Sequence, residues 1–159
     1  MKLKLALGLS LLAALAVAGS ETPMEVAKRF STAYVKAMKT KDLTHFDQGS
    51  TEDFVYIDGH GRKAGKTQAV AGIKSAFSMM TITSFDVKVV SAKKAEGGVL
   101  YVTEAKMVAT MKTGGPKPSM MVSNMRDETL VVPKGNKWYY KRVKELKDDT
   151  TIDGKPMKM

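Results

Sequence analysis

The sequence predicts a single α+β domain in which helices lie on one side of an antiparallel β-sheet. The first observation is a change of hydrophobic period at Thr81: apolar residues recur about every four positions before it and every second position after it. The second is that three glycine-containing breaks of the hairpin type, at 96–98, 114–116 and 133–136, divide the later half of the chain. Helices followed by a run of strands are typical of the α+β class.

The first 18 residues have the composition of a secretory signal peptide. Lys2 and Lys4 precede an apolar stretch over 5–18, which is shorter than the ~20 residues that a membrane span needs. The stretch ends in Ala16-Val17-Ala18, which fits an A-x-A cleavage site. We therefore expect residues 1–18 to be removed, and the protein to be secreted or periplasmic with no stable membrane anchor. An uncleaved anchor is the alternative.

The charge of the chain does not indicate a nucleic-acid partner. The chain has 26 basic and 16 acidic residues, a net charge of +10, and removal of Lys2 and Lys4 leaves 24 basic residues. The lysines are spread along the chain and are not gathered in one stripe, so we expect a solvated lysine surface and no nucleic acid. The sequence has no cysteine, which excludes disulfides, thiolate metal sites and a thiol nucleophile. We expect no cofactor.

The first helix is predicted by a capping box. Thr22 can cap it, Pro23 suits its first position, and Glu25 completes the box. Its apolar face recurs every four residues and ends near Lys39. The residues on that face are Val26, Phe30, Tyr34 and Met38.

A short helix over 42–49 and a hairpin follow. The hairpin consists of a strand over 52–57, an Asp-Gly-His-Gly turn at 58–61 and a return strand at 62–63. Thr67 can then cap a third helix, whose apolar face carries Val70, Ile73, Phe77 and Met80.

Four long strands complete the domain, which we place at 19–147. The alternation of apolar and polar residues locates them around Phe85 and over Val99–Lys112, Ser119–Val132 and Lys137–Leu146. The tail, 148–159, is polar and is expected to be frayed.

Several short motifs occur in an order typical of one superfamily. They are the run Thr-Glu-Asp-Phe-Val-Tyr-Ile-Asp at 51–58, Gly61, Gly65-Lys66, and Gly-Asn-Lys-Trp at 135–138. In this order the chain resembles the cone-shaped NTF2-like proteins, in particular the SnoaL-like and ketosteroid-isomerase-like proteins. The resemblance implies three N-terminal helices with an inserted hairpin, packed on a curved four-stranded antiparallel meander. It also implies a pocket inside the cone and a possible homodimer through the sheet, but no single activity.

The same resemblance suggests three catalytic residues. In ketosteroid isomerases a carboxylate removes a proton beside a carbonyl, while a tyrosine and a protonated aspartic acid stabilise the oxygen. These roles fall on Asp58 as base, and on Tyr34 and Asp127 as donors. The alternative is that Tyr34 is a core residue, Asp58 belongs to an ordinary Asp-Gly turn, and Asp127 lies in a solvated charged strand.

Apolar residues are expected to line the pocket, and methionines are prominent among them. If the hairpin at 114–115 pairs Met111 with Met121, then Met107 pairs with Met125 and all four share one face. We expect an adaptable apolar wall, with a copper(I) site as a less favoured alternative. The predicted lining is Phe30, Phe54, Met107, Met121 and Met125.

Other motifs indicate no metal or nucleotide site. The segment 59–67 resembles a phosphate-binding loop, but His60 stands where that pattern requires glycine. His45 and His60 have no partner at metal-ligand spacing, so we expect no metal.

Three classes of function remain open. The preferred one is a secreted domain that binds a small apolar or amphipathic molecule. The second is an enzyme of the ketosteroid-isomerase type, with Asp58 as base. The third is an envelope protein-interaction module whose interior is filled by side chains.

Overall fold

A computed structural model describes residues 20–112 and 117–157. The predicted signal peptide and the turn at 113–116 lie outside the described residues. The helices are α1 (Pro23–Thr40), α2 (Thr44–Gln48) and α3 (Lys66–Met79). The strands are β1 (Ser50–Ile57), β2 (Lys63–Gly65), β3 (Met80–Ala95), β4 (Gly98–Met111), β5 (Ser119–Lys134), β6 (Lys137–Ile152) and β7 (Lys155–Pro156).

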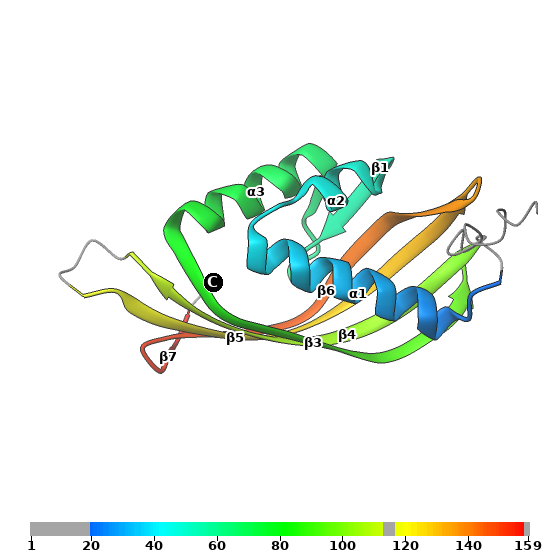
Figure 1. Ribbon diagram of the computed structural model, residues 1–159. Coiled ribbons are helices and arrows are strands. Elements are labelled where there is room, and N and C mark those ends of the chain that lie inside the picture. The colour runs from blue at the N-terminus through cyan, green and yellow to red at the C-terminus, as the bar shows by residue number, and fades with distance from the viewer. Residues whose placement is uncertain (1–19, 113–116, 158–159) are drawn as a thin grey trace, which may run out of the picture.

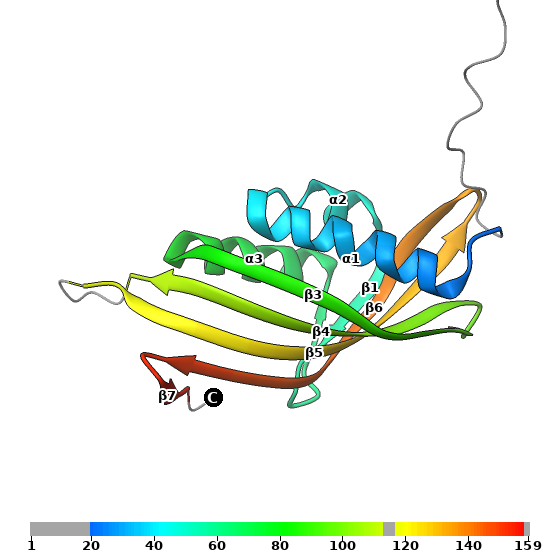
Figure 2. The same cartoon turned by 60° about the horizontal axis from the view of Figure 1, so that its bottom comes forward.

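The described strands form one mixed sheet in the order β2-β1-β6-β5-β4-β3, with β7 paired to β6. The α+β class is therefore confirmed, whereas the expected separation of hairpin and four-stranded meander is wrong. Strand β1 pairs in parallel with β6, with Tyr56 opposite Val143, so the hairpin extends the sheet. Figures 1 and 2 show all three helices on one side of the sheet, which bends around them.

Irregular pairing accompanies this curvature. Strands β3 and β4 change register between Ile82 and Ser84 and again between Val89 and Ser91. Strands β5 and β6 do so at Arg126/Asp127. An extra residue in one strand kinks it and increases its twist, so these bulges help the sheet to bend.

Helix α1 begins and ends as the sequence predicts. Thr22 Oγ1 accepts a hydrogen bond from the Glu25 N–H, and Glu25 Oε2 accepts one from the Thr22 N–H. The helix ends before Lys41, which has a left-handed φ of 58°. The Lys41 ammonium donates to the carbonyl oxygens of Phe77 and Met80 and so ties this end of α1 to the junction of α3 and β3.

Two predicted boundaries are corrected. Helix α3 begins at Lys66, after the N-cap residue Gly65 and not after Thr67. Residues 148–152 are not frayed, because Asp148, Thr150 and Ile152 pair with β5 and extend β6 to Ile152. A turn at 153–154 then returns the chain as β7.

The core between α1 and the sheet has two parts. One surrounds Phe85 and Phe77, and the other surrounds Phe30 and Phe54. Full burial of such a side chain stabilises the fold by about 1.5–3 kcal/mol. Among the described residues, no helix is long and apolar enough to cross a membrane.

Candidate functional site

A cavity of about 450 Å³ lies between helices α1 and α3 and the inner face of the sheet. Its walls are mostly apolar and aromatic. Tyr34 comes from α1, Phe54 and Tyr56 come from β1, and Tyr101 and Tyr140 come from the central strands. The helices therefore do not fill the hollow of the curved sheet.

Small residues on α3 keep this space open. Ala69, Gly72 and Ala76 line the cavity and recur at intervals of three and four, which places them on one face of the helix. A Cβ atom at Gly72 would meet nothing within 4 Å. Gly72 is itself exposed, so it lies at the rim where the cavity meets solvent.

Three carboxylates enter the cavity from the sheet: Asp127 on β5, and Glu145 and Asp148 on β6. Glu145 pairs with Asp127, and Asp148 pairs with Met125. Positions three apart in a regular strand face opposite sides of the sheet. The register change leaves Leu146 without a partner in the ladder, and it therefore turns both β6 carboxylates to the same side.

Two of these carboxylates, those of Glu145 and Asp148, accept hydrogen bonds from neighbouring groups. Glu145 Oε2 accepts from the Tyr56 hydroxyl at 2.8 Å, and Glu145 Oε1 accepts from the Gly59 N–H at 3.2 Å. A Cβ atom at Gly59 would lie 2.6 Å from Glu145 Oε1, so glycine allows this approach. Asp148 Oδ1 accepts from the hydroxyls of Ser123 and Thr150 at 2.8 and 2.6 Å.

Asp127 is in a different environment. Within the described ranges, no hydrogen bond reaches its carboxyl group. Burial, followed by the neighbouring carboxylates of Glu145 and Asp148, raises the pKa of Asp127 to about 7. This group can therefore donate a proton or accept one near neutral pH.

The tyrosines around Asp127 stay protonated. Burial, and secondarily the charge of Asp127, raises the pKa of Tyr34 above its usual range. The Tyr34 ring packs edge-on against Phe85, with 5.3 Å between ring centroids. In the described part of the chain its hydroxyl has no hydrogen-bond partner, so it can donate to a ligand.

The fold has relatives among solved structures. No protein-family model and no curated protein matches the sequence. An NTF2-like protein from Cytophaga hutchinsonii superposes with a TM-score of 0.62 and 10% identity, over 79% of this chain and 98% of that one. The chain has the NTF2-like fold.

Two further NTF2-like relatives carry names that suggest chemistry. A scytalone dehydratase-like structure from Novosphingobium aromaticivorans has a TM-score of 0.63 and 14% identity, over 80% of this chain and 85% of that one. A ketosteroid isomerase-like protein from Erwinia carotovora has a TM-score of 0.53 and 16% identity, over 79% of this chain and 92% of that one. At such identities the likeness shows the fold alone.

In this NTF2-like fold four predicted residues line the cavity, namely Tyr34, Phe54, Met125 and Asp127. Phe30, Met107 and Met121 do not: they are buried in the two core clusters. The predicted pairing of Met107 with Met125 is also wrong, because Ala105 pairs with Met125. The observed register differs from the predicted one by two residues, and side chains two apart on a strand point to the same face. The four methionines at 107, 111, 121 and 125 therefore still share a face.

The expectation that Asp58 faces the cavity is wrong. Its Oδ1 accepts hydrogen bonds from the His60 and Arg62 N–H groups at 2.9 Å, and its Oδ2 pairs with the Arg62 guanidinium. Burial raises the pKa of Asp58, but these hydrogen bonds outweigh it and hold the pKa below its usual value. Asp58 shapes the turn that presents Gly59 to Glu145.

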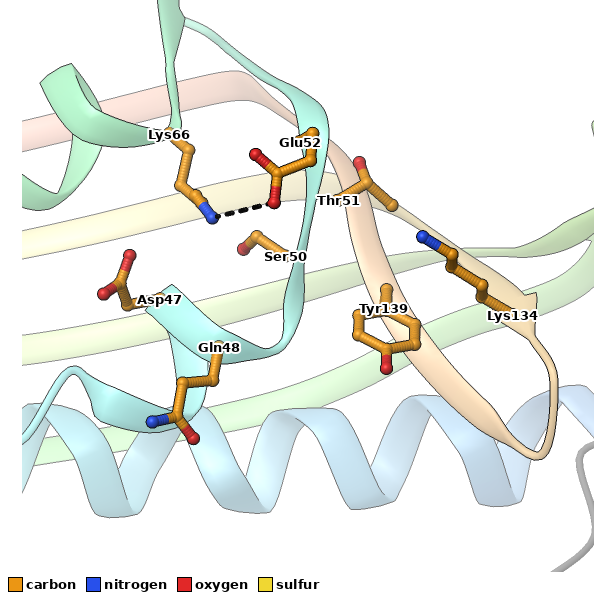
Figure 3. Close-up of a pocket in the computed structure, with 8 residues that line it drawn as sticks. All are labelled: Asp47, Gln48, Ser50, Thr51, Glu52, Lys66, Lys134 and Tyr139. Carbon is orange, nitrogen blue, oxygen red and sulfur yellow. Dashed lines mark ion pairs between the residues drawn. The ribbon is translucent and has the colours of Figure 1, made fainter.

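A second hollow, of about 390 Å³, lies outside the NTF2-like core (Figure 3). Its lining is mostly polar and half of it is exposed, and Lys66 points toward Glu52, with 3.9 Å between the charged atoms. It has neither an apolar wall nor a buried titratable group, so the inner cavity is the better candidate. Among the described residues, no three histidine, aspartate or glutamate side chains are placed to hold a metal ion. The lining of the outer hollow is Asp47, Gln48, Ser50, Thr51, Glu52, Lys66, Lys134 and Tyr139.

Proposed function

We propose that the protein binds a small, mostly apolar molecule in the inner cavity and holds the polar end of that molecule against Asp127. The observation that carries the proposal is the partly buried Asp127 carboxyl, which has no hydrogen-bond partner in the described part of the chain and lines a cavity of about 450 Å³. A cavity of this size falls within the range of small-molecule sites. A buried polar group without a partner is unfavourable, and a ligand that pairs with Asp127 removes that penalty.

Binding is tested with N-phenyl-1-naphthylamine, a neutral probe that fluoresces in apolar surroundings. We expect saturable fluorescence from the wild type. Gly72→Trp should abolish it, because Gly72 lines the cavity at its rim and has open space for an indole that would obstruct the entrance. Gly72→Ala is the matched control and should keep it. Equal fluorescence from all three proteins would place the probe outside the cavity and contradict the proposal.

A second candidate function is proton transfer next to a carbonyl, with Asp127 as the base in place of Asp58. It is favoured by the pKa of Asp127, which burial and then two carboxylates bring to about 7, and by the Tyr34 hydroxyl in the same cavity. Proton magnetic resonance in D₂O would show exchange of the α-protons of a cyclic ketone. Asp127→Asn should abolish that exchange, and Asp58→Asn should leave it unchanged.

Export by residues 1–18 belongs to the same proposal. Expression of the full chain in a Gram-negative host should yield a periplasmic product whose mass corresponds to a new N-terminus near residue 19. Retention of Met1 in the mature protein would contradict export. A possible homodimer through the sheet stays a prediction, and the molecular mass of the protein in solution would test it.

A further inference from the structure

We infer that the ligand is an organic cation, an amine or ammonium group on a small apolar body; this inference rests on the proposed function. The charge of the cavity favours a cation. The inner cavity is lined by three carboxylates, and none of its described lining residues is lysine or arginine. The whole chain nevertheless has 26 basic residues against 16 acidic ones. The cavity thus has the opposite charge to the protein that surrounds it.

The three carboxylates differ in how many hydrogen bonds they accept. Both oxygens of Glu145 already accept hydrogen bonds, as does Oδ1 of Asp148. The carboxyl of Asp127 accepts none among the described residues, although like charges surround it. A cation beside Asp127 would neutralise this repulsion, whereas an anionic ligand would add to it.

The aromatic wall of the cavity also favours a cation. Rings of Tyr34, Tyr56, Tyr101 and Tyr140 line the cavity together with Phe46 and Phe54. Phe46 packs edge-on against Phe54, with 5.1 Å between ring centroids, so part of this wall is held by its own contacts. Aromatic faces attract ammonium groups, most strongly where water is excluded.

Two polar groups of the cavity agree with a cationic ligand. Ser31 Oγ is buried and lacks a partner in the described chain, so the lone pairs of its oxygen are available to the positively charged end of a ligand. His45 also lines the cavity, and burial, followed by the charge of Arg29, lowers its pKa. Its imidazole is therefore neutral at pH 7 and adds no positive charge that would repel the ligand.

The inference fixes the sign of the pH dependence. A cation is held by ionised Asp127, so its affinity rises with pH through the titration of that group. A neutral carbonyl ligand would need protonated Asp127 as a donor, and its affinity would fall. If binding requires ionised Asp127, with its pKa of about 7, affinity rises by up to about 30-fold from pH 5.5 to 8.5.

Isothermal titration of the whole protein with a matched pair of probes tests this. The probes are phenethyltrimethylammonium and its neutral carbon isostere, (3,3-dimethylbutyl)benzene. At pH 8 we expect the cation to bind at least tenfold more tightly than the isostere, and its affinity to rise with pH. Asp127→Asn should remove the pH dependence, and Glu128→Gln, the next residue on the strand, should preserve it.

A second variant pair controls for folding and for surface binding. Asp148→Asn should weaken cation binding severalfold, while Asp149→Asn should not, because Asp149 is exposed and paired with Lys147. Isostere binding that equals or exceeds cation binding would overturn the cationic ligand and leave the proposed function standing. Failure of both probes and of N-phenyl-1-naphthylamine to enter the cavity would overturn both. Cation binding that Gly72→Trp leaves unchanged would also overturn the inference.

Discussion

Replacement of Asp127 by asparagine should change how stability depends on pH. The pKa of Asp127 is about 7 in the folded protein, raised by burial and then by two carboxylates, against an ordinary value of 3.8. The folded state therefore holds this proton more tightly than the unfolded state does. Stability from this group is fully present below pH 3.8 and is lost as pH rises through 7.

The difference between the two pKa values corresponds to about 4 kcal/mol, at 1.36 kcal/mol per unit. Asp127 is partly accessible through the cavity, which screens it, so we expect about 2–4 kcal/mol. Between pH 4.5 and 8, the unfolding free energy of the wild type should fall by this amount relative to that of Asp127→Asn.

Urea unfolding at half-unit pH intervals measures the effect. The difference in unfolding free energy between wild type and variant cancels the groups that they share, such as His45. Glu128→Gln should show no such trend, because that side chain lies on the opposite face of β5. A pH-independent difference between wild type and Asp127→Asn, or one of opposite sign, would refute the assignment of a raised pKa to Asp127.

Other predictions concern the core and the turn. Phe85→Ala should lower the unfolding free energy by about 3–5 kcal/mol, because Phe85 is completely buried, whereas Val90→Ala, at a position 41% exposed, should change it by less than about 0.5 kcal/mol. Gly59→Ala should weaken the binding of phenethyltrimethylammonium severalfold, because the added Cβ would displace the Glu145 side chain. A crystal structure of the variant with the Glu145 side chain unmoved would count against this. Asp58→Asn should leave the affinity for phenethyltrimethylammonium within about twofold of the wild type, because Asp58 is outside the cavity and an asparagine oxygen can still accept the two N–H groups that shape the turn. Calorimetry measures this affinity, and a tenfold loss in a variant whose turn is unchanged would contradict the placement of Asp58.

Local patterns in the sequence predicted the helices and strands whose formation depends on interactions between residues close together in the chain. The Thr22–Glu25 capping box and the four-residue period predicted α1 and placed Tyr34 on its inner face. Residue alternation located the long strands. The parallel pairing of β1 with β6 joins segments far apart in the chain, and no local pattern specifies it.

The candidate site was only partly predictable for the same reason. Asp127 was placed by resemblance, and the structure puts it in the cavity. Glu145 and Asp148 were missed because the bulge at Leu146 breaks the period of two on which strand analysis depends. The prediction that Asp58 is the base was wrong. Its carboxylate instead accepts the turn N–H groups, as the alternative of an Asp-Gly turn predicted.

Asp127 is a partly buried, titratable group that pairs with the ligand under the proposed function. Its ¹³Cγ chemical shift, followed from pH 4 to 9 with and without phenethyltrimethylammonium, tests this most directly. We expect a midpoint near pH 7 in the free protein and a lower midpoint with the cation bound. A midpoint near 4 that the probe leaves unchanged would contradict the account.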